Sequence, residues 1–174
     1  MKLPKGYVQV YTGSGKGKTT AALGLALRAA GAGLKVYFAQ FVKGMRYSEI
    51  AALERFADLI EVHQFGRRCF IRREPAPEDI AAARRGLEAV KSAVLSGSYD
   101  LMVLDEANIA VRYQLFTVME LLETVELGGG RMEFVITGRD ADPRLLDRAD
   151  LVTEMKEVKH YYSSGVEARD GIER

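Results

Sequence analysis

The sequence has few of the residues that mark disulfide-rich, zinc-binding or membrane proteins. Its 174 residues include one cysteine, Cys69, so no disulfide can form within the chain, and this favours a reducing, cytoplasmic setting. The two histidines, His63 and His160, lie far apart and match no zinc-ligand spacing with Cys69. No apolar run approaches the roughly 20 residues of a membrane span. The N-terminus also lacks the apolar stretch of a signal peptide.

The chain also lacks an excess of charge of either sign. Its 25 Lys and Arg residues against 24 Asp and Glu residues give a formal net charge of +1, so nothing draws the whole chain to nucleic acid. A local basic patch remains possible. Hydrophobic residues make up 48% and charged residues 28%, as in ordinary soluble globular proteins. We expect one domain spanning residues 1–174, with no nucleic-acid or membrane partner.

Short β-prone runs alternate with helical patterns along the chain. The strands are continuous apolar runs, which indicates a mostly parallel sheet with helices on both faces, an α/β fold of three layers. In such a sheet, ligands gather at the carboxyl ends of the strands. We expect strands at 7–11, 35–40, 60–64, 101–104, 133–137 and 151–154, and helices at 18–30, 49–57 with Ser48 as its cap, 78–95, 115–123 and 143–149.

The stretch YTGSGKGKTT, residues 11–20, is similar to a phosphate-binding loop. Gly17, Lys18 and Thr19 fill the end of the pattern G-x-x-x-x-G-K-[ST], but Thr12 stands where the first glycine is expected. The loop lies between a predicted strand and a predicted helix, as the pattern requires. The alternative, a glycine-rich turn with exposed lysines, fits this context less well.

Glycines in this loop let backbone N–H groups approach phosphate oxygens closely. Lys18 would reach the phosphates as a point charge, and the Thr19 hydroxyl would ligate magnesium. The expected nucleotide-binding set is Gly13, Ser14, Gly15, Lys16, Gly17, Lys18, Thr19 and Thr20.

The run LMVLDE predicts a buried strand that ends in two acids, Asp105 and Glu106. Such a pair is typical of a Walker B element, which would place it about one magnesium shell from Thr19. Alone, an acidic helix cap explains it equally well. Beside a phosphate-binding loop, metal binding is favoured.

Arg139 follows another predicted strand, in VITGRD, and two interpretations stay open. It could face the phosphates, or it could be a surface arginine paired with Asp140 or Asp142. His63 is expected to be a packed or surface residue. From the residues alone, the chain is predicted to be an α/β protein that binds Mg-ATP, either an ATPase or a transferase.

Several segments together resemble the ATP:corrinoid adenosyltransferases, a bacterial and archaeal family of vitamin B12 metabolism. They are TGSGKGKTTAALGLALRAAG, AQFVKG, VLDE, VITGRDADPRLLDRADLVTEM and VKHYYSSGVEARDGIE. The resemblance spans residues 7–172. The combination of GKGKTTAA, QF-x-KG, ITGR and the closing VKH…GV-x-A-x-x-GI is highly specific, although each piece alone would be weak.

The resemblance implies a RecA-like P-loop fold, usually as a homodimer, with ATP bound in the reverse sense along the loop. It implies transfer of the 5′-deoxyadenosyl group of ATP to Co(I) of a corrinoid, with inorganic triphosphate leaving. A reductase or flavoprotein would supply the Co(I). The family shares the departure at Thr12. Its motifs assign Lys16, Lys18 and Arg139 to catalysis, and Thr19, Glu106 and Asp105 to magnesium.

The sequence departs from the family in having no tryptophan, and it begins almost directly at the first strand. Many members carry an aromatic pair that includes Trp in the loop after the third strand, where it displaces the corrinoid's lower ligand. Here that loop, residues 65–74, reads FGRRCFIRRE, with Phe65, Cys69, Phe70 and Ile71 as its apolar side chains. It is either a corrinoid contact or a solvated basic loop. Competing functions are a RecA-like ATPase or motor, a small-molecule kinase and a nucleotide-sensing module.

Overall fold

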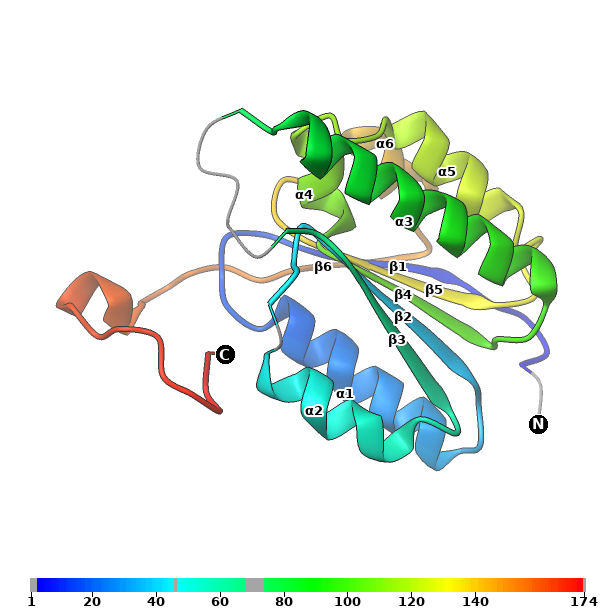
Figure 1. The fold of residues 1–174 in the computed structure, drawn as a ribbon, viewed down its shortest axis with the longest axis horizontal. Coiled ribbons are helices and arrows are strands. Elements are labelled where there is room, and N and C mark those ends of the chain that lie inside the picture. The colour runs from blue at the N-terminus through cyan, green and yellow to red at the C-terminus, as the bar shows by residue number, and fades with distance from the viewer. Residues whose placement is uncertain (1–2, 46, 68–73, 174) are drawn as a thin grey trace.

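The structure is a computed structural model that describes residues 3–45, 47–67 and 74–173. In this part of the chain six strands form one sheet in the order β3-β2-β4-β5-β1-β6, and every neighbouring pair is parallel (Figure 1). The strands are β1 (Val8–Thr12), β2 (Val36–Phe41), β3 (Ile60–Phe65), β4 (Leu101–Asp105), β5 (Glu133–Thr137) and β6 (Leu151–Glu154).

Helices cover both faces of the sheet. Helices α1 and α2 lie on one face, and α3, α4, α5 and α6 lie on the other (Figure 1). The predicted three-layer α/β architecture is therefore confirmed. The helices are α1 (Lys18–Gly31), α2 (Ser48–Leu53), α3 (Pro77–Ser96), α4 (Ala107–Arg112), α5 (Val118–Glu126) and α6 (Pro143–Arg148), with short 3-10 helices η1 (Glu54–Phe56) and η2 (Tyr161–Ser164).

Each face of the sheet has its own hydrophobic core. Phe41, Leu87 and Phe134 belong to the core under α3 to α6, and Ala22 and Phe38 belong to the core under α1 and α2. Strand β2 lies inside the sheet and all its residues are buried, which explains its almost unbroken apolar sequence VYFAQF. Its one amide side chain, that of Gln40, lies near the carboxyl end of the strand, beside the candidate active site described below.

The observed helices differ from the expected ones in three respects. The helix expected at 115–123 lies at Val118–Glu126, and α4 was not among the expected helices. Thr117 caps α5 by accepting a hydrogen bond from the Glu120 N–H, while the Glu120 carboxylate accepts one from the Thr117 N–H. Ser48 is the first residue of α2 rather than its cap, and Tyr47 holds the cap position.

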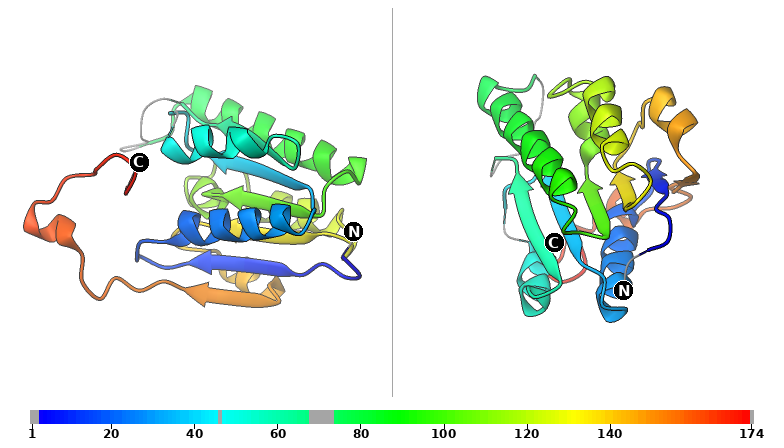
Figure 2. Two further views of the ribbon diagram at one scale, coloured as in Figure 1. Left: turned by 90° about the horizontal axis from the view of Figure 1, so that it is seen from below. Right: turned by 90° about the vertical axis from the view of Figure 1, so that its right-hand side faces the viewer.

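The last strand and the C-terminal segment lie against the P-loop. Met155 N–H donates to the Thr12 carbonyl at 2.9 Å, and Gly15 N–H donates to the Met155 carbonyl at 2.7 Å. Beyond residue 156 the chain extends away from the carboxyl edge of the sheet (Figure 2). Within the described ranges, no helix combines the length and the apolar character needed to cross a membrane.

Close packing of α3 on the sheet gives a test of the core. A Cβ at Gly86 would lie 2.5 Å from Cγ of Phe65, whereas a Cβ at Gly24 of α1 would meet nothing within 4 Å. Gly86→Ala should therefore destabilise the protein by about 1–3 kcal/mol through overpacking. Gly24→Ala, the matched control, should stabilise it by about 0.5–1 kcal/mol. Urea unfolding measures both, and equal effects of the two changes would contradict this packing.

Candidate active site

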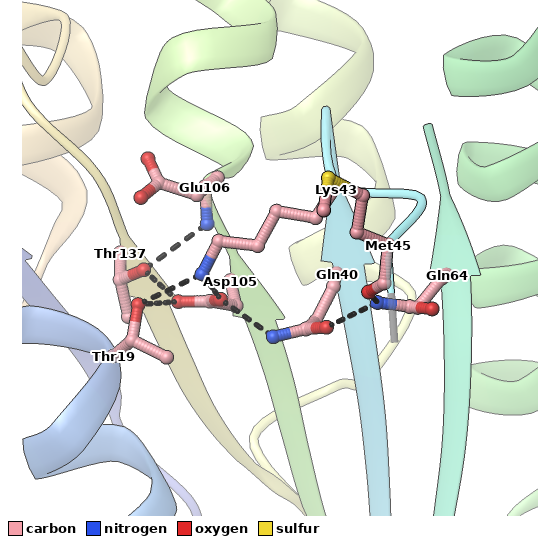
Figure 3. Close-up of polar contacts among 8 residues, drawn as sticks. All are labelled: Thr19, Gln40, Lys43, Met45, Gln64, Asp105, Glu106 and Thr137. Atoms are coloured by element: carbon pink, nitrogen blue, oxygen red, sulfur yellow. Dashed lines mark hydrogen bonds and ion pairs between the residues drawn. The ribbon is translucent and has the colours of Figure 1, made fainter. Parts of the chain in front are cut away.

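The carboxyl ends of four strands bring the predicted motifs to one edge of the sheet. The glycine loop follows β1, residues 42–44 follow β2, the acid pair ends β4, and Gly138 follows β5. Strand β5 lies between β1 and β4, so the loop and the acids face each other across one strand. The expectation that the acid pair lies close to Thr19 is confirmed, because the Thr19 hydroxyl donates a hydrogen bond to Asp105 (Figure 3).

The glycine loop encloses its own lysine. Gly13 and Gly17 have φ values of 96° and 119°, which side-chain-bearing residues rarely adopt. The Lys18 side chain donates to the carbonyls of Gly13 and Gly15, both at 2.7 Å, and the residue is 8% exposed. Burial lowers the pKa of Lys18, and Glu106 acts against that shift. Phosphate oxygens would be stronger partners for this ammonium than the two uncharged carbonyls are.

Thr12, at the position of the missing glycine, anchors the base of the loop. The residue is buried, and its Oγ1 accepts a part-buried hydrogen bond of 3.3 Å from the Ala141 N–H, in the segment that follows β5. Its carbonyl accepts the hydrogen bond from Met155. A glycine could make only the second contact, so threonine adds a link between the loop and the neighbouring strand end.

Replacing Thr12 by valine keeps its shape and removes the hydroxyl. We expect a loss of about 1 kcal/mol in the free energy of unfolding, because the Ala141 N–H would lose a partly buried acceptor. Thr12→Ser keeps the oxygen and should stay within about 0.5 kcal/mol of wild type. Chemical denaturation distinguishes the two. A valine variant as stable as the serine variant would show that this hydrogen bond contributes nothing.

Asp105 is the centre of the site and is fully buried. Its Oδ1 accepts hydrogen bonds from the hydroxyls of Thr19 at 2.9 Å and Thr137 at 2.7 Å. Its Oδ2 accepts from the Lys43 ammonium at 2.8 Å and from the Gln40 amide at 3.2 Å. The carboxylate thus has a cation and three neutral donors (Figure 3). Such support is what a buried charge requires.

Glu106 is arranged differently from its neighbour. Its backbone φ is 59°, at the start of α4, and its N–H donates to Thr137 Oγ1 at 3.1 Å. Its carboxylate has no hydrogen-bond partner among the described residues and points away from Asp105 (Figure 3). Burial and the charge of Asp105 raise the pKa of Glu106, while Lys43, Lys18 and Arg139 oppose the rise. The carboxylate oxygens of Glu106 are therefore free to bind a ligand, whereas those of Asp105 already accept four hydrogen bonds.

The donor set suits a hard divalent cation. The described residues contain no cluster of three or more His, Cys, Asp and Glu side chains. A P-loop magnesium site does not need one, because a hydroxyl, one or two carboxylates and the phosphates of the substrate complete it. Thr19 Oγ1, Asp105 and Glu106 could provide these oxygens. The Lys43 ammonium already lies 3.2 Å from Thr19 Oγ1 and 2.8 Å from Asp105 Oδ2.

The other residues predicted to bind nucleotide lie at the edge of the site. Lys16 is exposed and donates to the Ile172 carbonyl at 3.1 Å, so in this structure it contacts the C-terminal segment rather than the cradle. Ser14 and Thr20 are exposed. The Gly15 N–H, expected to face phosphate, is occupied by the Met155 carbonyl.

Arg139 is exposed and forms no ion pair within the described part of the chain. Its two candidate partners are engaged elsewhere, since Asp140 pairs with Arg112 and Asp142 pairs with Arg144. The pairing considered as the alternative is therefore not formed. Arg139 is near enough to Lys18 and Glu106 to influence the pKa of each.

The loop after β3 is only partly described. Phe65 packs against the ring of Phe41, with centroids 5.9 Å apart, and lies beside Gly86, so this partly buried side chain covers the edge of the core. Arg67 lies 3.7 Å from the carboxylate of Glu78. The predicted contacts of Cys69, Phe70 and Ile71 lie outside the described residues.

The prediction for His63 is confirmed. Its ring stacks on Tyr37, with centroids 5.0 Å apart, and its Nε2 lies 2.6 Å from Glu61.

Sequence reasoning missed three residues that contact Asp105: Lys43, Gln40 and Thr137. Lys43 and Gln40 belong to the segment QF-x-KG and Thr137 to ITGR, both of which carried the resemblance without a role for these side chains. For Gln40 there was a usable signal, because a polar residue near the carboxyl end of a buried parallel strand lies where ligands gather.

A glycine loop with a buried lysine, facing an acid pair across a parallel sheet, defines a P-loop nucleotide-binding α/β protein. The chain belongs to the ATP:corrinoid adenosyltransferase family BtuR/CobO/CobP, whose family model matches residues 4–174. It is therefore a transferase, as the motifs indicated.

Three relatives are similar along nearly the whole chain. The corrinoid adenosyltransferase of Pseudomonas aeruginosa is 34% identical over 170 residues, which cover 97% of this chain and 84% of the relative. That of Sinorhizobium sp. is 35% identical, covering 97% and 80%. That of Escherichia coli K12 is also 35% identical, covering 97% and 86%.

Proposed function

We propose that this protein transfers the 5′-deoxyadenosyl group of ATP to Co(I) of a corrinoid and releases inorganic triphosphate, in cobalamin biosynthesis or salvage. The observation that carries the proposal is the family match over residues 4–174. The site supports it, because Lys18, Thr19 and Asp105 form a charged cradle at the carboxyl edge of the sheet.

In this reaction the protein has to stabilise the negative charge of the leaving triphosphate, and no protein base is needed because Co(I) is itself the nucleophile. The electron pair of Co(I) forms the cobalt–carbon bond at C5′, and the electrons of the C5′–oxygen bond leave with the triphosphate. About four negative charges then depart together, and preorganised donors are the usual means of stabilising them. The Lys18 ammonium, backbone N–H groups of residues 13–19 other than that of Gly15, and, at the rim, Lys16 and Arg139 are the donors that would serve here.

Thr19, Asp105 and Glu106 would hold Mg²⁺, which would neutralise part of the charge of the triphosphate. Burial of Asp105 and the unengaged carboxylate of Glu106 support this set. We also propose a single domain over residues 1–174, a cytoplasmic homodimer, and a separate reductase or flavoprotein that delivers Co(I).

A reduced corrinoid tests the proposal directly. Under anaerobic conditions, protein, Mg-ATP and chemically reduced cobalamin or cobyrinic acid a,c-diamide should give a product with the absorption spectrum of an alkyl–cobalt bond. Light should destroy that spectrum, since this bond is photolabile. A spectrum unchanged from the protein-free control, with both corrinoids, would overturn the proposal.

A further inference from the structure

Lys43 occupies an unusual position for a lysine. Its ammonium lies between two oxygens of the proposed metal site, 3.2 Å from Thr19 Oγ1 and 2.8 Å from Asp105 Oδ2 (Figure 3). Its side chain is 18% exposed and that of Asp105 is not exposed at all. The positive charge is therefore inside the site rather than on its rim.

The backbone that presents Lys43 is strained. Val42, the residue before it, has φ of 61°, which is a genuine outlier for a β-branched side chain. Strain of this kind persists where the surrounding structure enforces it, and it concentrates at functional sites. It turns the chain at the end of β2 and places Lys43 at the site.

Close backbone packing holds this turn in place. A Cβ at Gly44 would lie 2.3 Å from the Gly66 carbonyl oxygen, and a Cβ at Gly66 would lie 2.4 Å from the Lys43 nitrogen. Two glycines at facing positions thus let the turn after β2 press against the end of β3. The position of Lys43 is consequently built into the fold.

A divalent cation bound to Thr19 and Asp105 and the Lys43 ammonium would repel each other and compete for the same oxygens. We propose that Lys43 is a tethered cation that occupies the metal site of the nucleotide-free protein, excludes free Mg²⁺, and yields the site when the metal arrives with ATP. The triphosphate supplies the negative charge that can then accept the displaced ammonium. This inference rests on the proposed metal site, and it makes metal binding conditional on nucleotide.

Manganese binding without nucleotide tests the inference. Mn²⁺ replaces Mg²⁺ with similar ligand preferences, and its free concentration is measured by electron paramagnetic resonance. Lys43→Met should bind Mn²⁺ at least tenfold more tightly than wild type does. Lys43→Arg, which keeps the charge, should resemble wild type, and so should Lys156→Met, which removes an exposed lysine beside the P-loop. Adding Asp105→Asn to Lys43→Met should abolish the gain.

Two results would overturn the inference: wild-type protein that binds Mn²⁺ without nucleotide as tightly as Lys43→Met does, or a gain that survives Asp105→Asn. Neither result bears on adenosyl transfer, which is measured separately by the corrinoid product.

A second measurement needs only a folded wild-type protein with ¹⁵N-labelled lysines. The Lys43 ammonium resonance should shift on addition of Mg²⁺ and ATP together and stay in place with Mg²⁺ alone. A resonance that ignores both additions would also overturn the inference.

Discussion

Lys18→Ala is expected to reduce adenosyl transfer by at least about 10²-fold while the protein stays folded. Lys18 is the only lysine side chain of the P-loop that points into it in the described structure, where it is held by two backbone carbonyls. Substrate phosphates would replace those carbonyls and gain a full positive charge in a partly desolvated site. Since the charge on the leaving group grows in the transition state, the loss should be in kcat more than in KM.

Lys16→Ala is the matched control for this prediction. Lys16 belongs to the same loop but is exposed and contacts the Ile172 carbonyl, so we expect its removal to cost less than about tenfold. Single-turnover kinetics with reduced corrinoid measures both variants. A Lys18→Ala enzyme with near-normal kcat, or equal losses in the two variants, would contradict the assignment of the cradle.

Asp105→Asn is expected to lower the free energy of unfolding by about 3 kcal/mol and to abolish activity. The change leaves the Lys43 ammonium in the interior without its counter-charge, which is costly for a buried pair. This loss lies at the lower end of the usual range for a broken buried ion pair, because the Lys43 side chain is 18% exposed to solvent. The new amide N–H₂ would also face the hydroxyls of Thr19 and Thr137.

Asp140→Asn removes a charge of the same type from an exposed pair, in which the side chains of Arg112 and Asp140 are 55% and 60% exposed. Its cost should be below about 1 kcal/mol. Urea denaturation at neutral pH compares the two variants. If Asp105→Asn proved as mild as Asp140→Asn, Asp105 would not be the electrostatic centre of this site.

The sequence predicted those parts of the fold that depend on local pattern. Apolar runs such as VYFAQF and LMVLD indicated buried parallel strands, because residues covered on both faces have no reason to alternate. Helix α4, Ala107–Arg112, was not among the expected helices because its first turn follows the acid pair directly and no side chain caps it. The residue before it, Glu106, has a left-handed backbone conformation with φ of 59°, and no pattern in the sequence predicts that conformation.

The site was predictable where a motif carries its own mechanism. The loop ending in Lys18 and Thr19 and the acid pair were found this way, and the structure brings Thr19 and Asp105 into direct contact. The role of Lys43 was not predictable, since it depends on the turn at Val42 and on the packing of Gly44 against Gly66. Both features depend on how the ends of β2 and β3 pack together, and the spacing of residues in the sequence does not predict that packing.

The identity of the phosphate product tests the central claim most directly. The enzyme, Mg-ATP and reduced corrinoid should be followed by phosphorus NMR together with the absorbance of the alkyl–cobalt product. Attack at C5′ predicts that inorganic triphosphate appears in step with that product, one for one, and that ATP is nearly stable when corrinoid is omitted. The acid pair Asp105 and Glu106 would also suit an ATPase, which orients water at the γ-phosphate. Steady release of ADP and phosphate without corrinoid would contradict the account.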